Sequence, residues 1–227
     1  MAEFKGFFKE TLTFFNQLAE NNNKEWFDQH KKGYEQYVRQ PSEQFVVALG
    51  ERLRTIAPGI HAVPKTNQSL FRLNRDTRFS HDKRPYKTNL GILLWEGERK
   101  KMACTGFYFH LERGKLMMGA GMHLIPKPLL GPFRDAVVHE KHGPKLKDAI
   151  KKVSRHGYTI GTKHYKKTPR GYDEAHENAD FLLYNGLFAM YEAEIPEELF
   201  SKKLLTHAFS HYKKMAPLHT WLLDALG

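Results

Sequence analysis

Apolar side chains in the first sixty residues recur with the spacing of an α-helix. Intervals of four, three and three positions mark one helical face, formed by Phe8, Leu12, Phe15 and Leu18. The asparagines at 21–23 suit the end of this helix and the cap of a second one. Pro41 suits the first turn of a third helix, which the Pro-Gly pair at 58–59 would end. The pattern predicts an N-terminal segment of three helices.

Beyond Pro64 the hydrophobic period shortens to that of β-strands. Short aromatic or aliphatic segments separated by turn residues predict strands at 69–73, 89–95, 105–112 and 115–122. Alternation within 105–112 indicates a strand buried on one face only. Arg113 and Gly114 provide a tight connection, so we expect the last two segments to form a hairpin. Gly119 and Gly121 indicate either a bulge or the close approach of another backbone or a ligand.

Helical spacing returns in the second half of the chain, at residues 127–140 and 145–156. Residues 187–195 predict a further strand. Pro196 would open a last helix, and Pro217 would break it. Because no repeat or linker divides the chain, we expect one α+β domain over residues 1–227, with a mainly antiparallel sheet and helices packed against it.

Composition agrees with a globular protein of the reducing cytoplasm. Hydrophobic residues make up 41% and charged residues 27% of the 227 positions, which favours a buried core over disorder. Cys104 is the single cysteine and cannot form an intramolecular disulfide. No window has the ~20 consecutive apolar residues of a membrane span. We therefore expect a soluble, cytoplasmic protein with no membrane partner.

The net charge of +11 is concentrated in two segments. Residues 65–91 hold seven lysines and arginines against two aspartates, and residues 141–170 hold ten against one aspartate. Such a distribution favours an anionic partner. A solvated basic surface without a partner is the alternative for the second segment.

The densest mixture of functional groups lies in residues 71–88, which we call the arginine loop. Guanidinium and ammonium groups bind phosphate or carboxylate oxygens, and the anion-binding candidates here are Arg72, Arg75, Arg78, Lys83 and Lys87. Asp76 and Tyr86 are candidates for moving protons. Alternatively, Asp76 and Asp82 pair with the arginines and the loop is a scaffold.

Residues 163–178, the second basic loop, carry further candidates. His176 is a candidate proton carrier near neutral pH, and Lys167 and Arg170 could add positive charge to a pocket. These residues complete such a pocket only if the second basic loop folds beside the arginine loop; an exposed basic turn is the alternative. His207 and His211 have the spacing of helical metal ligands but no evident third ligand, so we expect no metal site.

Several of these motifs resemble the bacterial and fungal family catalogued as domain of unknown function 2461. The resemblance rests on residues 22–27, on residues 71–88, on residues 119–122, and on residues 168–172 with His176 downstream. Ala120 departs from the glycine expected there. The resemblance implies a single-domain α+β protein and places the family's characteristic residues on both basic loops. It implies no particular reaction, cofactor or substrate.

Three functions fit these features. The first is a pocket that binds, and in an enzyme acts on, a small molecule bearing phosphate or carboxylate. The second is a nucleic-acid-binding module that uses residues 65–91 and 141–170. The third is a structural or interaction domain in which the arginine loop serves folding. The sequence favours the first and leaves open the enzymatic activity, the cofactor and the oligomeric state.

Overall fold

An antiparallel sheet lies at the centre of the structure, a computed structural model that describes residues 3–161 and 163–227. In this part of the chain six strands follow the order β1-β2-β3-β4-β6-β5. Their bounds are β1 (Ile60–His61), β2 (Leu90–Glu96), β3 (Thr105–Glu112), β4 (Lys115–Met122), β5 (Thr159–Ile160) and β6 (Leu187–Glu194). The expected hairpin is confirmed, because Glu112 pairs with Lys115 across a turn in which Gly114 has a φ of +74°.

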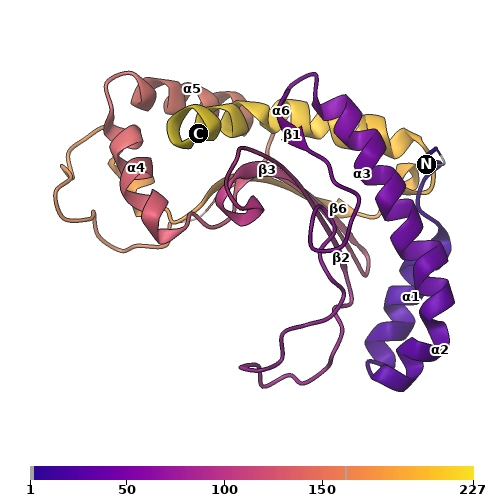
Figure 1. Ribbon diagram of the computed structural model, residues 1–227. Helices are drawn as coiled ribbons and strands as arrows, with labels where there is room; N and C mark the ends of the chain where they lie inside the picture. Colours follow the sequence, from indigo (N-terminus) through magenta and orange to yellow (C-terminus); the bar gives the residue numbers. More distant parts are fainter. Residues whose placement is uncertain (1–2, 162) are drawn as a thin grey trace.

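Helices cover one face of this sheet, which confirms the α+β class. The last helix, α6 (Lys203–Leu226), packs on β3, β4 and β6, and α5 (His142–Ser154) packs against α6 (Figure 1). α4 (Lys127–Val138) lies at the left in Figure 1 and packs against α5 and α6. Alternate residues of β3 and β4, including Phe107, Phe109 and Leu116, are fully buried beneath these helices. The Tyr212 hydroxyl of α6 also donates a 2.9 Å hydrogen bond to the Tyr108 carbonyl oxygen.

The N-terminal helices form a second layer beside the sheet. α1 (Lys9–Glu20) is followed by α2 (Lys24–Tyr34), whose N-cap Asn23 accepts a 2.9 Å hydrogen bond from the Trp26 N–H. α2 and α3 (Gln40–Leu53) are joined without a break by a π-helical turn, η1 (Glu35–Arg39), so the second and third predicted helices form one rod. Phe8 is exposed rather than inward-facing, and Phe14 packs in the core instead.

Pro217 does not break the last helix, contrary to the sequence-based prediction. α6 continues through it to Leu226. Proline removes one backbone hydrogen bond, but the residues that follow it carry large apolar side chains that pack in the core. Leu218, Trp221 and Leu222 are almost fully buried, and the Trp221 Nε1–H donates a 2.9 Å hydrogen bond to the His142 carbonyl oxygen. This packing outweighs the missing hydrogen bond.

The predicted strand at residues 69–73 is also wrong. The Phe71 N–H donates to the Gly91 carbonyl oxygen, and the Leu93 N–H donates to the Ser69 carbonyl oxygen, so the segment touches β2 briefly. It is preceded by a turn in which Asn67 has a φ of +66°, and it then leaves the sheet to begin the arginine loop. The contact is too short to form a regular strand, and only an isolated bridge joins Leu70 to Ile92.

The glycines of β3 and β4 allow neighbouring backbones to approach closely. Gly106 pairs directly with Gly121. A Cβ atom on Gly106 would lie 2.3 Å from the Leu94 carbonyl oxygen, and one on Gly121 would lie 2.4 Å from the Leu187 carbonyl oxygen. The β4 registers with both neighbours are uninterrupted. Of the two alternatives for this segment, the structure shows close backbone approach and not a bulge.

No helix in the described residues is both long enough and apolar enough to cross a lipid bilayer.

Candidate functional site

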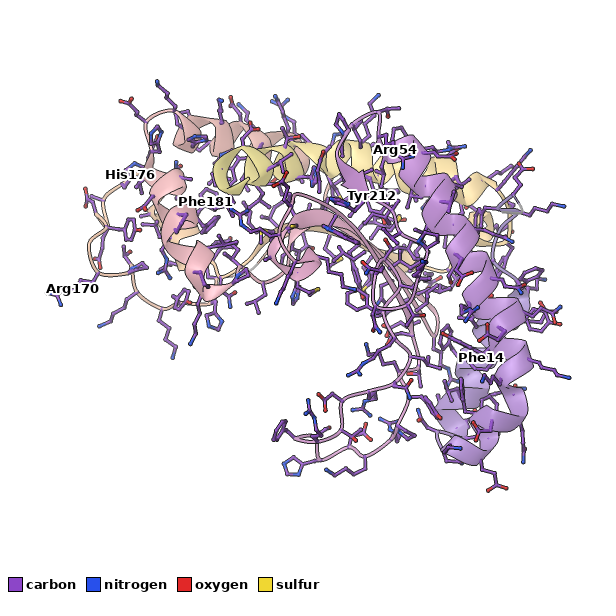
Figure 2. All side chains as sticks on the ribbon, in the orientation of Figure 1. Phe14, Arg54, Arg170, His176, Phe181 and Tyr212 are labelled. Carbon is purple, nitrogen blue, oxygen red and sulfur yellow. The ribbon has the colours of Figure 1, made fainter. Side chains whose placement is uncertain are left out.

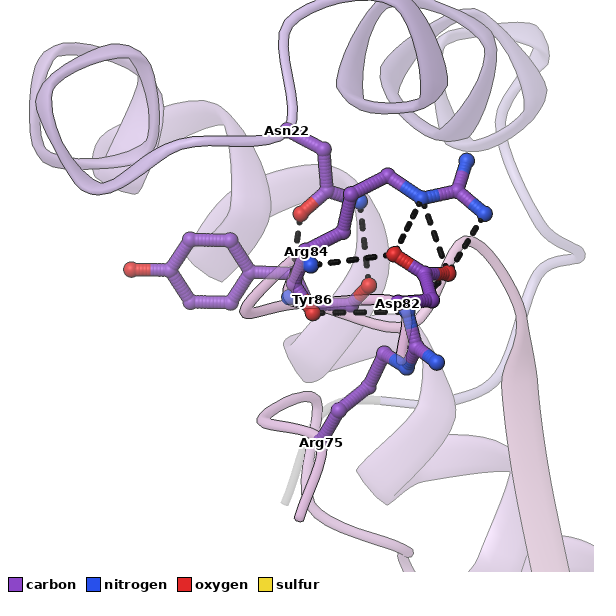
Figure 3. Close-up of polar contacts among 5 residues, drawn as sticks. All are labelled: Asn22, Arg75, Asp82, Arg84 and Tyr86. Carbon is purple, nitrogen blue, oxygen red and sulfur yellow. Dashed lines mark hydrogen bonds and ion pairs between the residues drawn. The ribbon is translucent and has the colours of Figure 1, made fainter. Parts of the chain in front are cut away.

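The arginine loop is held together by ion pairs between its own residues (Figure 3). Asp82 accepts from Arg84 at 2.7 Å (Nη2 to Oδ2) and from Arg75 at 2.5 Å (Nη1 to Oδ2). Hydrogen bonds from Arg84, and secondly from Arg75, hold the pKa of Asp82 far below its usual range. Arg78 binds Asp76 through Nε at 3.0 Å and Nη2 at 2.7 Å, and this contact lowers the pKa of Asp76. Two of the predicted anion-binding arginines are therefore already paired.

The loop is anchored to the N-terminal layer through Tyr86. The Asn22 side chain accepts from the Tyr86 N–H and donates to the Tyr86 carbonyl oxygen, both at 3.0 Å. The Tyr86 ring stacks on Phe27 with 4.5 Å between centroids, and it points away from Asp82 in Figure 3. Burial raises the pKa of Tyr86. These contacts anchor Tyr86 to the N-terminal helices. Its hydroxyl was predicted to move protons beside the loop cations, but its ring packs on Phe27.

The other residues that the sequence predicted to form the site lie in separate parts of the structure. Arg72 and Lys83 are exposed on the arginine loop, where the Lys83 ammonium donates to the Thr77 carbonyl oxygen at 3.0 Å. The second basic loop lies beside α4 at the opposite end of the sheet (Figure 1), and Figure 2 shows Arg170 and His176 at that end. Lys167 is exposed there. The structure therefore does not bring the two basic loops together.

His176 has a local structural contact in the second basic loop. Its Nδ1 accepts a 3.0 Å hydrogen bond from the Asn178 N–H. The loop is tied to α4 by the Tyr172 hydroxyl, which donates to the Asp135 carboxylate at 2.8 Å, and by Arg134, which lies 4.9 Å from the Tyr165 ring centroid. The proton-transfer role of His176 stays a prediction.

A cavity of about 400 Å³ occupies the face of the sheet opposite the helices, and we call it the sheet-face cavity. Four residues on adjacent strands pair in register across this face: Leu93 of β2, Tyr108 of β3, Gly119 of β4 and Met190 of β6. Side chains from outside the sheet complete its walls, among them Phe71 from the arginine loop and Lys101 and Met102 from the 3₁₀ helix η2 (Lys101–Ala103). The lining is mostly apolar, and four of its members are methionines, namely Met102, Met117, Met122 and Met190.

Two lysines lie near the ring of Phe71, which forms part of the cavity wall; Lys101 lines the cavity as well. The Lys101 ammonium lies 4.5 Å and the Lys87 ammonium 5.6 Å from the Phe71 ring centroid. Burial lowers the pKa of both lysines. A neighbouring positive charge lowers it further, that of Arg72 for Lys87 and that of Lys87 for Lys101. Among the described residues, no carboxylate lies within ion-pair distance of either lysine. The Lys101 ammonium instead donates a 2.6 Å hydrogen bond to the Gln68 carbonyl oxygen.

Tyr108 and His110 add polar groups to the same cavity. The Tyr108 hydroxyl lies 2.9 Å and the Asn89 amide nitrogen 3.5 Å from His110 Nδ1. Because the amide nitrogen can only donate, Nδ1 is assigned as the acceptor and Nε2 carries the proton. His110 Nε2 is buried without a hydrogen-bond partner in the described part of the chain, and it lies 3.4 Å from the Glu112 carboxylate. Burial raises the pKa of Tyr108, which therefore stays protonated.

The two helical histidines lie elsewhere, on α6. The rings of His207 and His211 are 4.9 Å apart, and the Tyr158 hydroxyl lies 2.9 Å from His211 Nδ1. Burial lowers the pKa of His211 to about 4. In the residues that the structure describes, no three His, Cys, Asp or Glu side chains are grouped as metal ligands.

Sequence reasoning missed Lys101, Tyr108 and His110. A signal was present, because Gly91, Gly106, Gly119 and Gly121 occupy the same face of their strands as Tyr108 and His110. An alternating strand whose outward neighbours are glycines predicts a hollow rather than a solvated polar surface. Recognising it requires the strand register, which the sequence pattern does not contain.

These features define an α+β protein whose antiparallel sheet is covered by helices on one face and carries a ligand-sized cavity on the other. The chain matches the model of the family described as conserved hypothetical protein (DUF2461) over residues 10–221, nearly its whole length, and it belongs to that family. The resemblance seen in the sequence is thereby confirmed. No curated protein matches the chain.

Proposed function

We propose that the sheet-face cavity binds a small molecule with an apolar body and one phosphate or carboxylate group. The observation that carries the proposal is the pair of lysines beside Phe71, without a carboxylate partner in the described residues: Lys101 lines the mostly apolar cavity, and Lys87 lies on the Phe71 ring of its wall. Partly buried positive charge costs free energy unless it is compensated. An anionic group on the ligand would provide that compensation.

The size and lining of the cavity agree with this ligand class. A volume of about 400 Å³ falls within the range of small-molecule sites. Phe71, Leu93 and Phe188 offer flat or aliphatic contact surface. The methionines can adapt to an irregular apolar body, because the thioether side chain is flexible and polarisable.

The arginine loop has a supporting role under this proposal. Its internal ion pairs and the Asn22 contact fix the path of the chain from Phe71 to Lys87. The Lys87 N–H donates to the Leu73 carbonyl oxygen at 2.8 Å, which holds the two strands of the loop together near the cavity. Arg72 is the loop arginine whose charge acts on Lys87, so it is the one best placed to reinforce an anion there.

The proposal predicts ligand binding that depends on these lysines. Para-toluate and phenyl phosphate should raise the melting temperature of the wild-type protein, since ligands of the native state stabilise it by mass action. Lys87→Ala and Lys101→Ala should each weaken binding about tenfold, the effect of losing one charge-assisted contact of roughly 1.5 kcal/mol. Calorimetric titration provides the affinities, and Lys100→Ala, which changes the exposed neighbour, is the matched control.

Two outcomes would overturn this assignment. One is the absence of binding by any aromatic carboxylate or phosphate, and the other is binding that neither lysine substitution weakens. Oligonucleotides belong in the same titration, because Phe79 is 93% exposed next to Arg78 and offers a stacking surface. Stabilisation by oligonucleotides alone, lost steeply with salt, would instead support the nucleic-acid-binding alternative.

A further inference from the structure

We infer that the Lys101 side-chain amine is a nucleophile that forms an imine with the carbonyl group of a ligand in the sheet-face cavity. The inference rests on the proposed function, which brings the ligand to this site. The ligand class narrows accordingly to an aldehyde or ketone that has an apolar body and an anionic group. Lys87 would hold the anion, and Lys101 would react.

The position of Lys101 distinguishes it from the other lysines of the protein. It is the one lysine among the residues that line the cavity in the described structure. Its Nζ contacts the Phe71 ring and donates a 2.6 Å hydrogen bond to the Gln68 carbonyl oxygen. A neutral amine can make this hydrogen bond as well as an ammonium, because both carry N–H donors.

The electrostatic surroundings increase the fraction of Lys101 that is present as the free amine, the form that such a reaction requires. Burial against apolar side chains and the charge of Lys87 both lower the pKa of Lys101, the combination that activates lysine nucleophiles. The Phe71 ring acts in the opposite direction because its face attracts the ammonium, but this attraction is weak at a partly exposed site. Lys115 and Lys163 show the contrast, since a carboxylate partner raises the pKa of each.

The reaction balances without any further reagent. The lone pair of Lys101 Nζ attacks the carbonyl carbon, and a proton moves from nitrogen to oxygen to give a carbinolamine. Loss of the hydroxyl group as water leaves the C=N bond, so amine and carbonyl become imine and water. The proton for the departing oxygen comes from solvent, because the Tyr108 hydroxyl in the same cavity already donates its proton to His110 Nδ1.

Reductive trapping tests this inference directly. The wild-type protein is incubated at neutral pH with para-carboxybenzaldehyde and cyanoborohydride, which reduces the imine to a stable secondary amine. Peptide mass mapping should place the adduct on Lys101. Lys101→Arg keeps the positive charge but lacks a nucleophilic amine, so trapping should fall about tenfold or more. Lys100→Arg, at the exposed neighbouring position, should be trapped like the wild type.

The controls separate this inference from the proposed function. Para-toluate has no carbonyl group able to form an imine, so its binding to the wild type tests the ligand site without the imine. Para-toluate binding together with an adduct spread evenly over surface lysines would overturn the imine and leave the proposed function intact. Trapping that Lys101→Arg does not reduce would also overturn the imine. Failure of both para-toluate and phenyl phosphate to bind the wild type would overturn the proposed function instead.

Discussion

At the scale of single residues, the charged side chains of this protein divide according to the presence of a carboxylate neighbour. Arg75, Arg78 and Arg84 are each bound to an aspartate a few residues away. Lys87 and Lys101 contact an aromatic ring instead, beside an apolar cavity. The first group is paired within the arginine loop, and the second forms the anion site of the proposed function. A count of basic residues in the sequence does not separate the two groups.

The pairing inside the arginine loop leads to a prediction for Asp82→Asn. This substitution removes the negative charge that both Arg75 and Arg84 contact. Because the pairs are partly solvent-exposed, the free energy of unfolding should change by about 1 kcal/mol or less. Local opening should become easier, so trypsin should cleave within the loop several times faster at an almost unchanged melting temperature.

Limited proteolysis followed by mass mapping measures this effect. Asp180→Asn breaks a comparable exposed pair with Lys163 in another part of the molecule. It should leave the cleavage rate of the arginine loop unchanged. Equal cleavage rates for Asp82→Asn and the wild type would show that the ion pairs do not hold the loop.

At the scale of elements, the cavity depends on how closely β3 approaches its neighbours. Gly106 faces the cavity and pairs with Gly121 on β4 and Trp95 on β2. A side chain at Gly106 or at Gly121 would collide with the backbone of a neighbouring strand. Small residues therefore do two things at once: they permit close strand packing, and they leave the open face hollow.

Gly106→Ala should consequently destabilise the protein. The new Cβ atom would lie 2.3 Å from the Leu94 carbonyl oxygen, which neither strand can avoid without a backbone shift. We expect a loss of about 3 kcal/mol in the free energy of unfolding. Gly131→Ala is the matched control, because nothing lies within 4 Å of a Cβ atom there and the position is inside α4. It should stabilise by about 0.5–1 kcal/mol, as alanine does in a helix.

Urea denaturation of both variants provides the comparison. A Gly106→Ala protein as stable as the wild type would mean that the strands can separate at this position, and the explanation for the glycine would then be wrong.

At the scale of the whole molecule, a buried polar network joins the sheet to α6. Glu96 of β2 contacts His219 Nε2 at 2.7 Å and accepts a 2.6 Å hydrogen bond from the Gly59 N–H. The Thr105 hydroxyl lies 3.1 Å from His219 Nδ1. All three side chains are less than 10% exposed. The network therefore links the start of β3, the end of β2 and the last helix, which are far apart in the sequence.

This network predicts a pH dependence of stability. The hydrogen bond with His219, and secondly that with Gly59, lowers the pKa of Glu96. A carboxyl group whose pKa is lower in the folded state stabilises the protein fully above its unfolded pKa of about 4.3, and loses this effect as the pH falls through the lowered value. Glu96→Gln should cost about 1–3 kcal/mol at neutral pH and reduce the decline of stability below about pH 5.

Urea unfolding at neutral pH and at several acidic pH values measures both effects. Glu98→Gln, two residues away and exposed, should follow the wild-type curve. A Glu96→Gln curve parallel to that of the wild type at all pH values would rule out a titrating carboxylate in this network.

Local patterns in the sequence were sufficient for most of the elements. The bounds of β3 and β4 agree with the predicted segments 105–112 and 115–122, because strict alternation and a Gly-containing turn depend only on neighbouring residues. The α+β class follows from the same local patterns. The missed elements, β1 and β5, are two-residue strands that exist only through pairing with longer neighbours. Pro217 was misjudged because helix continuation there depends on burial against distant residues.

The sequence by itself thus determined the class of fold, the family and which residues share a face of each strand. It also marked residues 71–88 as chemically unusual. Only the tertiary structure decided that helices cover one face of the sheet and leave Tyr108 and His110 in a cavity on the other. It likewise decided which cations have carboxylate partners and that the two basic loops lie at opposite ends. The physical reason is that periodicity depends on neighbours along the chain, whereas coverage, pairing and burial depend on residues brought together by folding.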